Sequence, residues 1–173
     1  VEVAATMPFD EGLAHERDVF VRLRDGNKSK AMRHMFFAER EVAKVPGITK
    51  QTPVQKIEKA AVIGSGTMGG GIAMNFANAG IPVTLVDISD EALAAGLGKV
   101  KGNYAGTVSR GRLTQAKMDE RMALISATTA YADLADADII IEAVFEDMDL
   151  KKKIFFELDA ACKPETILAS NTS

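Results

Sequence analysis

Three glycines and one acid are the residues whose types and spacing point most directly to chemistry. Gly64, Gly66 and Gly69 have the spacing G-x-G-x-x-G, and Asp87 follows the last of them by 18 residues. In such a pattern the first glycine permits a tight turn, the second lets a diphosphate approach the backbone, and the third lets a helix pack closely. The acid then meets a ribose 2′-hydroxyl. Glycines also mark ordinary turns, so the spacing alone is weak evidence.

The residues around these glycines predict the structure that the pattern requires. Apolar residues 60–63 predict a strand before the turn, residues 67–79 a helix after it, and residues 83–86 a second strand that ends at Asp87. The free amides and positive dipole end of such a helix bind phosphates. We therefore predict a dinucleotide site. An acid rather than an arginine at position 87 predicts NAD rather than NADP, because a carboxylate repels a 2′-phosphate.

Composition excludes several classes of protein. The 173 residues are 47% hydrophobic and 26% charged, with a net charge of −3, which argues against a nucleic-acid partner. No apolar run approaches the roughly 18 residues of a membrane span. Cys162 stands alone, so no internal disulfide is expected, and we assign it a packing role. A reducing compartment follows: the cytoplasm, with the peroxisomal matrix as the alternative.

Residues 1–47 predict a helical connector. Residues 24–27 interrupt it, and Ser29 is expected to cap a second helix. Residues 48–55 predict an extended linker. The first helix carries one apolar stripe, formed by Phe9, Leu13, Phe20 and Leu23.

Both histidines of the chain, His15 and His34, lie in this connector. Neither has acid–base partners or metal-ligand spacing around it in the sequence, so we interpret both as surface or packing residues. We predict no metal site. Val1 is not an initiator methionine and Ser173 comes just after a predicted strand, so we expect a piece of a longer chain.

Residues 56–173 predict an α/β domain of the Rossmann type, with a doubly wound parallel sheet. In that architecture the first and fourth strands flank the point where the strand order reverses, and the ligand crevice lies at their carboxyl ends. The glycine turn, the loop 142–149 and the tail 171–173 are then expected around one cleft. The further elements are helices over residues 90–108 (capped by Ser89), 114–122 and 147–162, and strands over 125–129, 139–141 and 166–169.

Four motifs, GSGTMGGGIA, LVD, IIIEAVFEDMDLKK and ILASNTS, give the chain a family resemblance. In this order they resemble the NAD-binding domain of L-3-hydroxyacyl-CoA dehydrogenases. The preceding HMFFAEREVAKVPG is similar to the connector of multifunctional fatty-acid oxidation enzymes, which carry an enoyl-CoA hydratase domain upstream. The resemblance covers Ser29 to Ser173. It implies an acyl-CoA substrate and oxidation of 3-hydroxyacyl-CoA to 3-ketoacyl-CoA in fatty-acid β-oxidation.

The resemblance also implies roles for individual residues. Asp87 is expected to hold the adenosine ribose, Lys151 to lie near the nicotinamide ribose, and Glu146 near the ring and substrate. Ser173 is expected to contact the substrate's 3-oxygen, so Ser173 and Glu146 are the catalytic candidates. A solvated pair near a helix start is the alternative for Glu146 and Lys151, and Glu142 is expected only to cap a strand. The implied cofactor-binding residues are Gly64, Gly66, Thr67, Met68, Gly69, Asp87, Val144, Phe145, Glu146, Lys151 and Ser173.

In the family the general base is a histidine beyond the serine loop, oriented by a glutamate. Neither His15 nor His34 can replace it, because both precede the nucleotide fold. We therefore expect the given chain to bind NAD without turnover. A C-terminal helical domain, which closes the cleft and often dimerises, and an upstream hydratase domain are expected to be missing, and a homo-oligomer is one expectation.

Two other functions stay open. One is another NAD-dependent β-hydroxyacid-type dehydrogenase, which the spacing of IEAVFED and SNTS disfavours. The other is a nucleotide-binding module without chemistry, which a serine beside the cleft disfavours. Lys99 and Lys101 on the helix 90–108 either meet CoA phosphates or form a solvated face.

Overall fold

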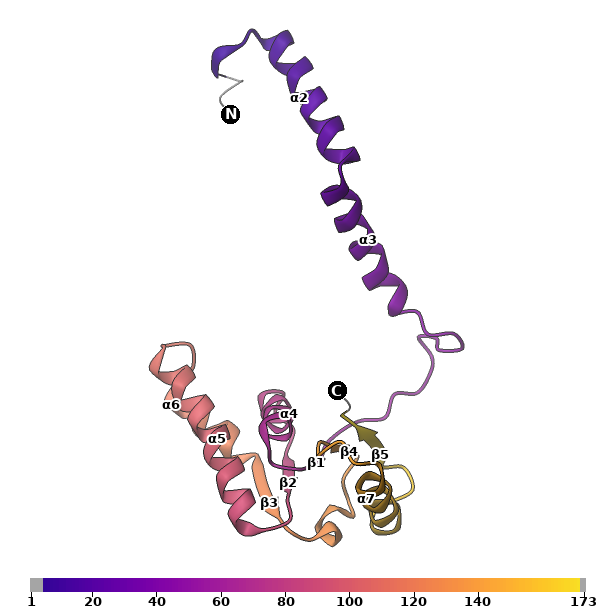
Figure 1. Cartoon of the computed structure of the whole chain (residues 1–173), viewed down its shortest axis with the longest axis vertical. Helices are drawn as coiled ribbons and strands as arrows, with labels where there is room; N and C mark the ends of the chain where they lie inside the picture. Colours follow the sequence, from indigo (N-terminus) through magenta and orange to yellow (C-terminus); the bar gives the residue numbers. More distant parts are fainter. Residues whose placement is uncertain (1–4, 172–173) are drawn as a thin grey trace. The chain divides into compact units, whose positions relative to one another are not determined.

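A computed structural model describes residues 5–171 of the chain, which divides into two compact units, Val1–Val54 and Gln55–Ser173 (Figure 1). The described part of the first unit contains the helices α2 (Phe9–Asp25) and α3 (Asn27–Val42). Neither helix has a buried residue. The predicted apolar stripe is therefore present on a helix but faces solvent.

Ser29 does not cap the second helix, so that prediction was wrong. The helix α3 begins two residues earlier, and Gly26 in an extended conformation (φ −70°, ψ 156°) separates it from α2. Ser29 lies inside α3, where its Oγ accepts a hydrogen bond from Nη1 of Arg33 at 2.8 Å. The hydroxyl of Ser29 thus binds a side chain one helical turn later, whereas a capping serine would bind a backbone amide.

The residues after α3 form turns where the sequence predicts an extended linker. The amide of Ile48 donates to the carbonyl of Val45, and that of Thr52 to the carbonyl of Thr49, both at 3.1 Å. The hydroxyl of Thr52 also accepts from the amide of Thr49 at 2.9 Å. Threonine hydroxyls stabilise turns by such local bonds, and a composition that fits a linker fits these turns equally well.

The second unit is built on one parallel sheet, and the predicted Rossmann-type α/β fold is confirmed (Figure 1). Its strand order, β3-β2-β1-β4-β5, reverses direction between β1 and β4. The strands are β1 (Ala60–Ile63), β2 (Val83–Val86), β3 (Ile125–Thr128), β4 (Ile139–Glu142) and β5 (Ile167–Ser170).

Side-chain caps fix where three of the helices of this unit begin. Ser89, Thr114 and Asp147 each accept a hydrogen bond from a backbone amide three residues further on. A 3₁₀ turn, η1 (Tyr131–Leu134), was not predicted from the sequence. The helices are α4 (Thr67–Asn78), α5 (Asp90–Ser109), α6 (Gln115–Ala123) and α7 (Met148–Ala161).

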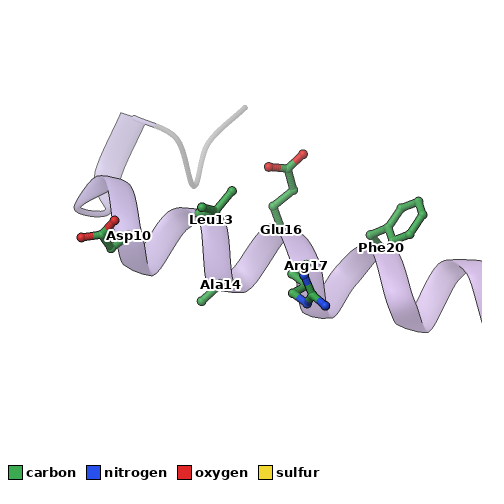
Figure 2. A pocket seen from close by; sticks show the side chains of 6 residues that line it. All are labelled: Asp10, Leu13, Ala14, Glu16, Arg17 and Phe20. Atoms are coloured by element: carbon green, nitrogen blue, oxygen red, sulfur yellow. The ribbon is translucent and has the colours of Figure 1, made fainter.

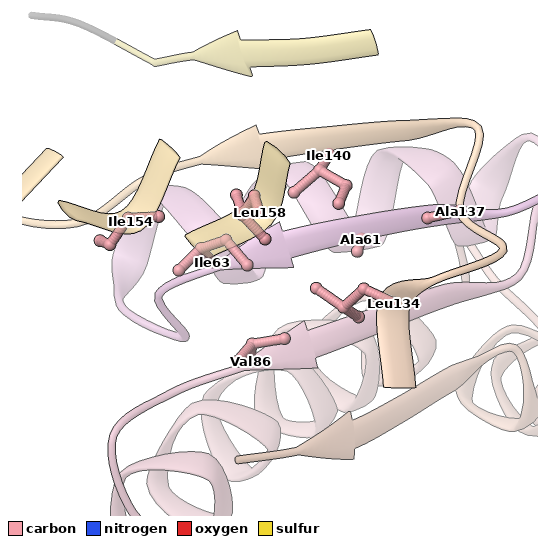
Figure 3. Close-up of a cluster of buried hydrophobic side chains, with 8 residues drawn as sticks. All are labelled: Ala61, Ile63, Val86, Leu134, Ala137, Ile140, Ile154 and Leu158. Atoms are coloured by element: carbon pink, nitrogen blue, oxygen red, sulfur yellow. The ribbon is translucent and has the colours of Figure 1, made fainter. Parts of the chain in front are cut away.

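Alternate residues of the strands enter two separate cores, one on each face of the sheet. Ala60 and Val62 of β1 pack with residues of α4 and α5, whereas Ala61 and Ile63 pack on the face covered by α7 and η1. Figure 3 shows the second cluster, in which side chains of β1, β2 and β4 meet those of η1 and α7. A sheet covered on both faces explains why its central strands are continuous apolar runs.

Strand register brings the carboxyl ends of β1, β4 and β5 to one edge. Ile63 pairs with Glu142, and Glu142 pairs with Ser170. The amide of Ala143 donates to the carbonyl of Ile63 at 2.8 Å, and that of Asn171 to the carbonyl of Glu142 at 2.8 Å. Three predicted site segments thus leave the sheet side by side.

Candidate cofactor-binding site

The turn after β1 requires glycine at its first position. Gly64 has φ +98°, a conformation that other residues adopt at a cost in energy. A Cβ atom there would also lie 2.7 Å from the carbonyl oxygen of Ala143. The glycine turn is therefore in direct contact with the start of the loop between β4 and α7, as a crevice between these segments requires.

The third glycine brings the helix onto the turn. A Cβ atom on Gly69 would lie only 1.8 Å from the carbonyl oxygen of Gly64 and 3.3 Å from Cγ1 of Val62. No residue with a Cβ atom fits at position 69. The N-terminus of α4 is consequently held directly against the glycine turn.

The second glycine leaves the mouth of the helix open. Gly66 is the N-cap residue of α4, no side chain caps this terminus, and its first turn carries no acid. A Cβ atom on Gly66 would meet nothing within 4 Å. The first amides of this helix thus have no side-chain cap and lie at the positive end of the helix dipole, which is the arrangement that binds a diphosphate.

Asp87 points to the glycine turn. Its Oδ2 accepts hydrogen bonds from the amide (2.7 Å) and hydroxyl (2.6 Å) of Ser65, and its Oδ1 accepts from the amide of Ile88 at 2.8 Å. Partial burial would raise the pKa of this carboxyl, but the three hydrogen bonds outweigh it and hold the pKa below its ordinary value. An ionised carboxylate has about four lone-pair positions, so one remains for a ribose hydroxyl.

Gly96, in the middle of α5, packs against the site and was not predicted from the sequence. A Cβ atom there would lie 2.5 Å from Cβ and 2.6 Å from Oγ of Ser65. The hydroxyl of Ser65 also lies 3.0 Å from the carbonyl of Ala92. A glycine inside a predicted helix was the available signal, since glycine there is unfavourable without a packing reason.

The loop from β4 to α7 carries the residues predicted for the nicotinamide side. Val144 is partly buried against the core, whereas Phe145 is 89% exposed. Glu146 forms an ion pair with Lys151, whose Nζ lies 3.0 Å from both carboxylate oxygens. These residues share the sheet edge with Gly64, Gly66, Gly69 and Asp87.

Lys151 is a buried lysine with two acidic partners. Besides Glu146, its Nζ lies 3.3 Å from Oε2 of Glu142, which is completely buried. The hydrogen bond to Glu146 and the charge of Glu142 raise the pKa of Lys151 despite the opposing effect of burial. Lys151 is therefore a cation at neutral pH.

The other predicted residues are exposed, pack against the core or lie outside residues 5–171. Thr67 and Met68 are exposed in the first turn of α4, and Thr172 and Ser173 lie outside the described residues. His15 and His34 are exposed on α2 and α3, and Lys99 and Lys101 are exposed on α5. Cys162 packs against the core, where burial raises the pKa of its thiol.

A hollow of about 450 Å³ in the first unit offers no second site. Figure 2 shows its side chains spread along successive turns of a single helix. Such a surface cannot enclose a dinucleotide. Its lining residues are Asp10, Leu13, Ala14, Glu16, Arg17 and Phe20 of α2.

Residues 5–171 contain neither a metal cluster nor a membrane-spanning helix. No three His, Cys, Asp or Glu side chains in this range are grouped so as to hold a metal ion. Within the same range, no helix has the length and apolar character needed to cross a membrane.

Comparison with known proteins identifies similar sequences that are consistent with a dinucleotide site. The family described as "3-hydroxyacyl-CoA dehydrogenase, NAD binding domain" matches residues 59–173. A peroxisomal fatty acid beta-oxidation multifunctional protein of Arabidopsis thaliana is 38% identical over the whole chain, which covers 24% of that protein. The fatty acid oxidation complex subunit alpha of Shewanella sp. (strain W3-18-1) is 42% identical over 94% of the chain and 23% of its own length.

A solved structure is similar as well. The (S)-3-hydroxybutyryl-CoA dehydrogenase of Ralstonia eutropha superposes with a TM-score of 0.67 at 40% identity, over 68% of this chain and 42% of that one. The chain thus spans about a quarter of the length of the curated relatives it matches.

Proposed function

This chain belongs to the 3-hydroxyacyl-CoA dehydrogenase family, whose NAD-binding domain it carries, and from that premise we propose that the enzyme containing it oxidises 3-hydroxyacyl-CoA to 3-ketoacyl-CoA. When bound, NAD would accept the hydride that leaves C3 of the substrate. The observation that carries the proposal is the uncapped mouth of α4, pressed against the glycine turn and faced by the ionised Asp87.

Different residues of the site bind different parts of the cofactor. The amides at the start of α4 bind the diphosphate, and the free lone pair of Asp87 accepts a ribose hydroxyl. The negative charge at position 87 repels a 2′-phosphate and so selects NAD over NADP. Thr67 and Met68 contribute through their backbone in the first helical turn.

The loop after β4 orients the nicotinamide end. Val144 and Phe145 line that side of the crevice, and Lys151 lies near the nicotinamide ribose. Glu146 and Ser173 are the catalytic candidates: Ser173 contacts the 3-oxygen of the substrate, and Glu146 lies near the reacting centre. Support for the place of Ser173 comes from Asn171, two residues before it, whose amide donates a hydrogen bond to the carbonyl of Glu142 at the end of β4.

The given chain is expected to bind NAD but not to turn over. Its two histidines are exposed on the helices of the first unit, and within residues 5–171 neither forms an ion pair with an acidic side chain that could orient a general base. The base, the C-terminal helical domain and an upstream hydratase domain belong to other parts of the enzyme. We assign the enzyme to a reducing compartment, the bacterial cytoplasm or alternatively the peroxisomal matrix. The single cysteine fits a reducing compartment, and the peroxisomal or glyoxysomal names of several relatives support the alternative.

Fluorescence titration tests the proposal. NADH should bind the chain more tightly than NADPH, and acetoacetyl-CoA should not be reduced by it. Failure to bind NADH would remove the assignment, and measurable reduction would show that the general base lies within the 173 residues. With the longer enzyme, oxidation of a simple 3-hydroxyacid without CoA would favour another β-hydroxyacid dehydrogenase, and absence of any oxidation would favour a module without chemistry.

A further inference from the structure

A fully buried carboxylate lies beneath the proposed nicotinamide side of the crevice. Glu142, the last residue of β4, is 0% exposed, although glutamate is almost never buried without a partner. It follows Ile141 in the strand next to β1, one residue along the register from the glycine turn. A side chain of this charge in that place needs a reason other than packing.

Both oxygens of this carboxylate are fixed by neighbouring elements. Oε1 accepts a hydrogen bond from the amide of Val144 at 2.7 Å, and Oε2 accepts one from the hydroxyl of Ser170 at 2.6 Å. These donors belong to the loop after β4 and to the end of β5. The carboxylate therefore has a single orientation, set from two sides.

The immobilised carboxylate in turn faces the ammonium of Lys151 from α7. Nζ lies 3.3 Å from Oε2 of Glu142 and 3.5 Å from Oγ of Ser170, and the side chain of Lys151 is 7% exposed. On its outer side the same Nζ binds Glu146, whose side chain is 57% exposed at the rim. Lysine is a flexible chain with three rotatable donors, so two carboxylates on opposite sides determine where its charge stands.

Stability does not explain this arrangement. A buried ion pair gains little over well-packed apolar side chains of the same size, because both charges lose their hydration. A function that depends on the position of the charge does explain it. Because Lys151 is proposed to lie near the nicotinamide ribose, the group that sets its position is set for the cofactor.

We propose that Glu142 is a positioning residue of the cofactor site: it holds the ammonium of Lys151 at the edge of the sheet where the nicotinamide half of NAD binds. This inference rests on the proposed function. It assigns Glu142 a role beyond capping a strand, and the role is exerted through Lys151 without contact with the cofactor.

The test compares NADH with ADP, which lacks the nicotinamide and its ribose. Glu142→Gln keeps the size of the side chain and removes the charge. It should weaken NADH binding about tenfold, the loss expected for one hydrogen bond to a charged group, while leaving ADP affinity within twofold. The control Glu157→Gln makes the same change on α7, where Glu157 forms a long ion pair with Lys153 at 3.9 Å, and should leave both affinities unchanged.

A double-mutant cycle then asks whether the effect passes through Lys151. In the Lys151→Met background, Glu142→Gln should change NADH affinity by less than twofold, because the two side chains act as one unit. Thermal unfolding followed by circular dichroism gives the folded fraction of each variant at the titration temperature. If Glu142→Gln does not fold, Ser170→Ala at the exposed end of β5 serves instead, because it removes a hydrogen bond that fixes the same carboxylate. It should weaken NADH binding by roughly threefold and leave ADP binding unchanged.

The outcomes separate the inference from the function that it rests on. Equal losses for NADH and ADP, unchanged NADH binding, or a full effect in the Lys151→Met background would each overturn the positioning role while the cofactor site stands. If the unaltered chain does not bind NADH, the proposed function falls, and this inference falls with it.

Discussion

The two units of this chain differ in how they use apolar residues. The helices α2 and α3 place large apolar side chains on their surfaces and bury none of them; Phe9 is 82% exposed. The unit that begins at Gln55 places its apolar residues on both faces of a sheet, and helices cover each face. Helices draw most of their stability from packing of an apolar face. The first unit therefore leaves its apolar side chains exposed, whereas the second buries apolar side chains on both faces of its sheet.

The amino-acid composition supplies a way to observe the units separately. The chain has no tryptophan, and both of its tyrosines, Tyr104 and Tyr131, lie in the second unit. Tyrosine fluorescence therefore follows the unfolding of that unit alone, whereas circular dichroism follows the helices of both units.

The largest expected effect comes from removing a central core side chain. Leu85→Ala should destabilise the second unit by about 2–5 kcal/mol, because Leu85 is 0% exposed and leaves a cavity. Leu13→Ala on α2 should change stability by less than about 0.5 kcal/mol. Urea unfolding followed by tyrosine fluorescence measures the first, and circular dichroism the second. Equal costs would contradict the contrast between the units.

A methyl group at a glycine should have opposite effects in the two units. Gly69→Ala forces a carbon to 1.8 Å from the carbonyl oxygen of Gly64 and should cost about 1–3 kcal/mol, with loss of NADH binding. Gly12→Ala on α2 meets nothing closer than 4.0 Å and should raise helix stability by about 0.5–1 kcal/mol. Gly71→Ala, in open space on α4, is the control within the same helix. A neutral Gly69→Ala would refute the close packing.

The charge at the end of β2 should affect binding more than folding. Asp87→Asn keeps the size of the side chain and should weaken NADH binding about tenfold, or about 1.4 kcal/mol. The ratio of NADH affinity to NADPH affinity should also decrease. Asp90→Asn, exposed at the start of α5, should change neither. Titration of all variants with both nucleotides checks this, and an unchanged preference would remove Asp87 as the selector.

The smallest expected effect concerns acid stability, and it again separates the units. Hydrogen bonds from Lys163 and from the amides of Glu58 and Lys59 lower the pKa of Asp138 to about 2. Its stabilising contribution is thus complete above the ordinary pKa of about 4 and lost as the pH falls toward 2. Asp138→Asn should be less stable at neutral pH and lose stability less steeply between pH 4 and 2.

The control lies in the first unit. The hydrogen bond from Arg24 lowers the pKa of Asp25, but this pair is exposed, and exposed pairs contribute little. Asp25→Asn should leave the tyrosine transition unchanged at every pH. A steeper acid loss in Asp138→Asn than in the unaltered chain would reverse the sign and refute the assignment.

Much of the fold followed from local patterns. Buried parallel strands are short and apolar without alternation, and three of the helices begin at Ser89, Thr114 or Asp147. The bounds of these elements were therefore predicted to within about two residues. The prediction that Ser29 caps a helix was wrong because a serine can occupy either a cap or a helix interior. The turn η1 carries no comparable signal, since a 3₁₀ turn needs only one hydrogen bond per turn.

The candidate site divides in the same way. The glycines and Asp87 stand close together in sequence and depend on backbone conformation, so their spacing and the strands and helix predicted around them indicated their arrangement. Gly96 and Ser65 meet only because α5 crosses the glycine turn, which no local pattern encodes.

By itself, the sequence determined the parallel sheet, the strand-to-helix turn and the acid that faces it, because apolar runs, glycines and caps act through neighbouring residues. The tertiary structure alone decided that Glu142 is buried, that Lys151 and Ser170 meet it, and that the stripe of α2 stays exposed. Burial of a charge or an apolar face depends on which distant elements pack there, and that is set by strand register and helix packing across the whole unit.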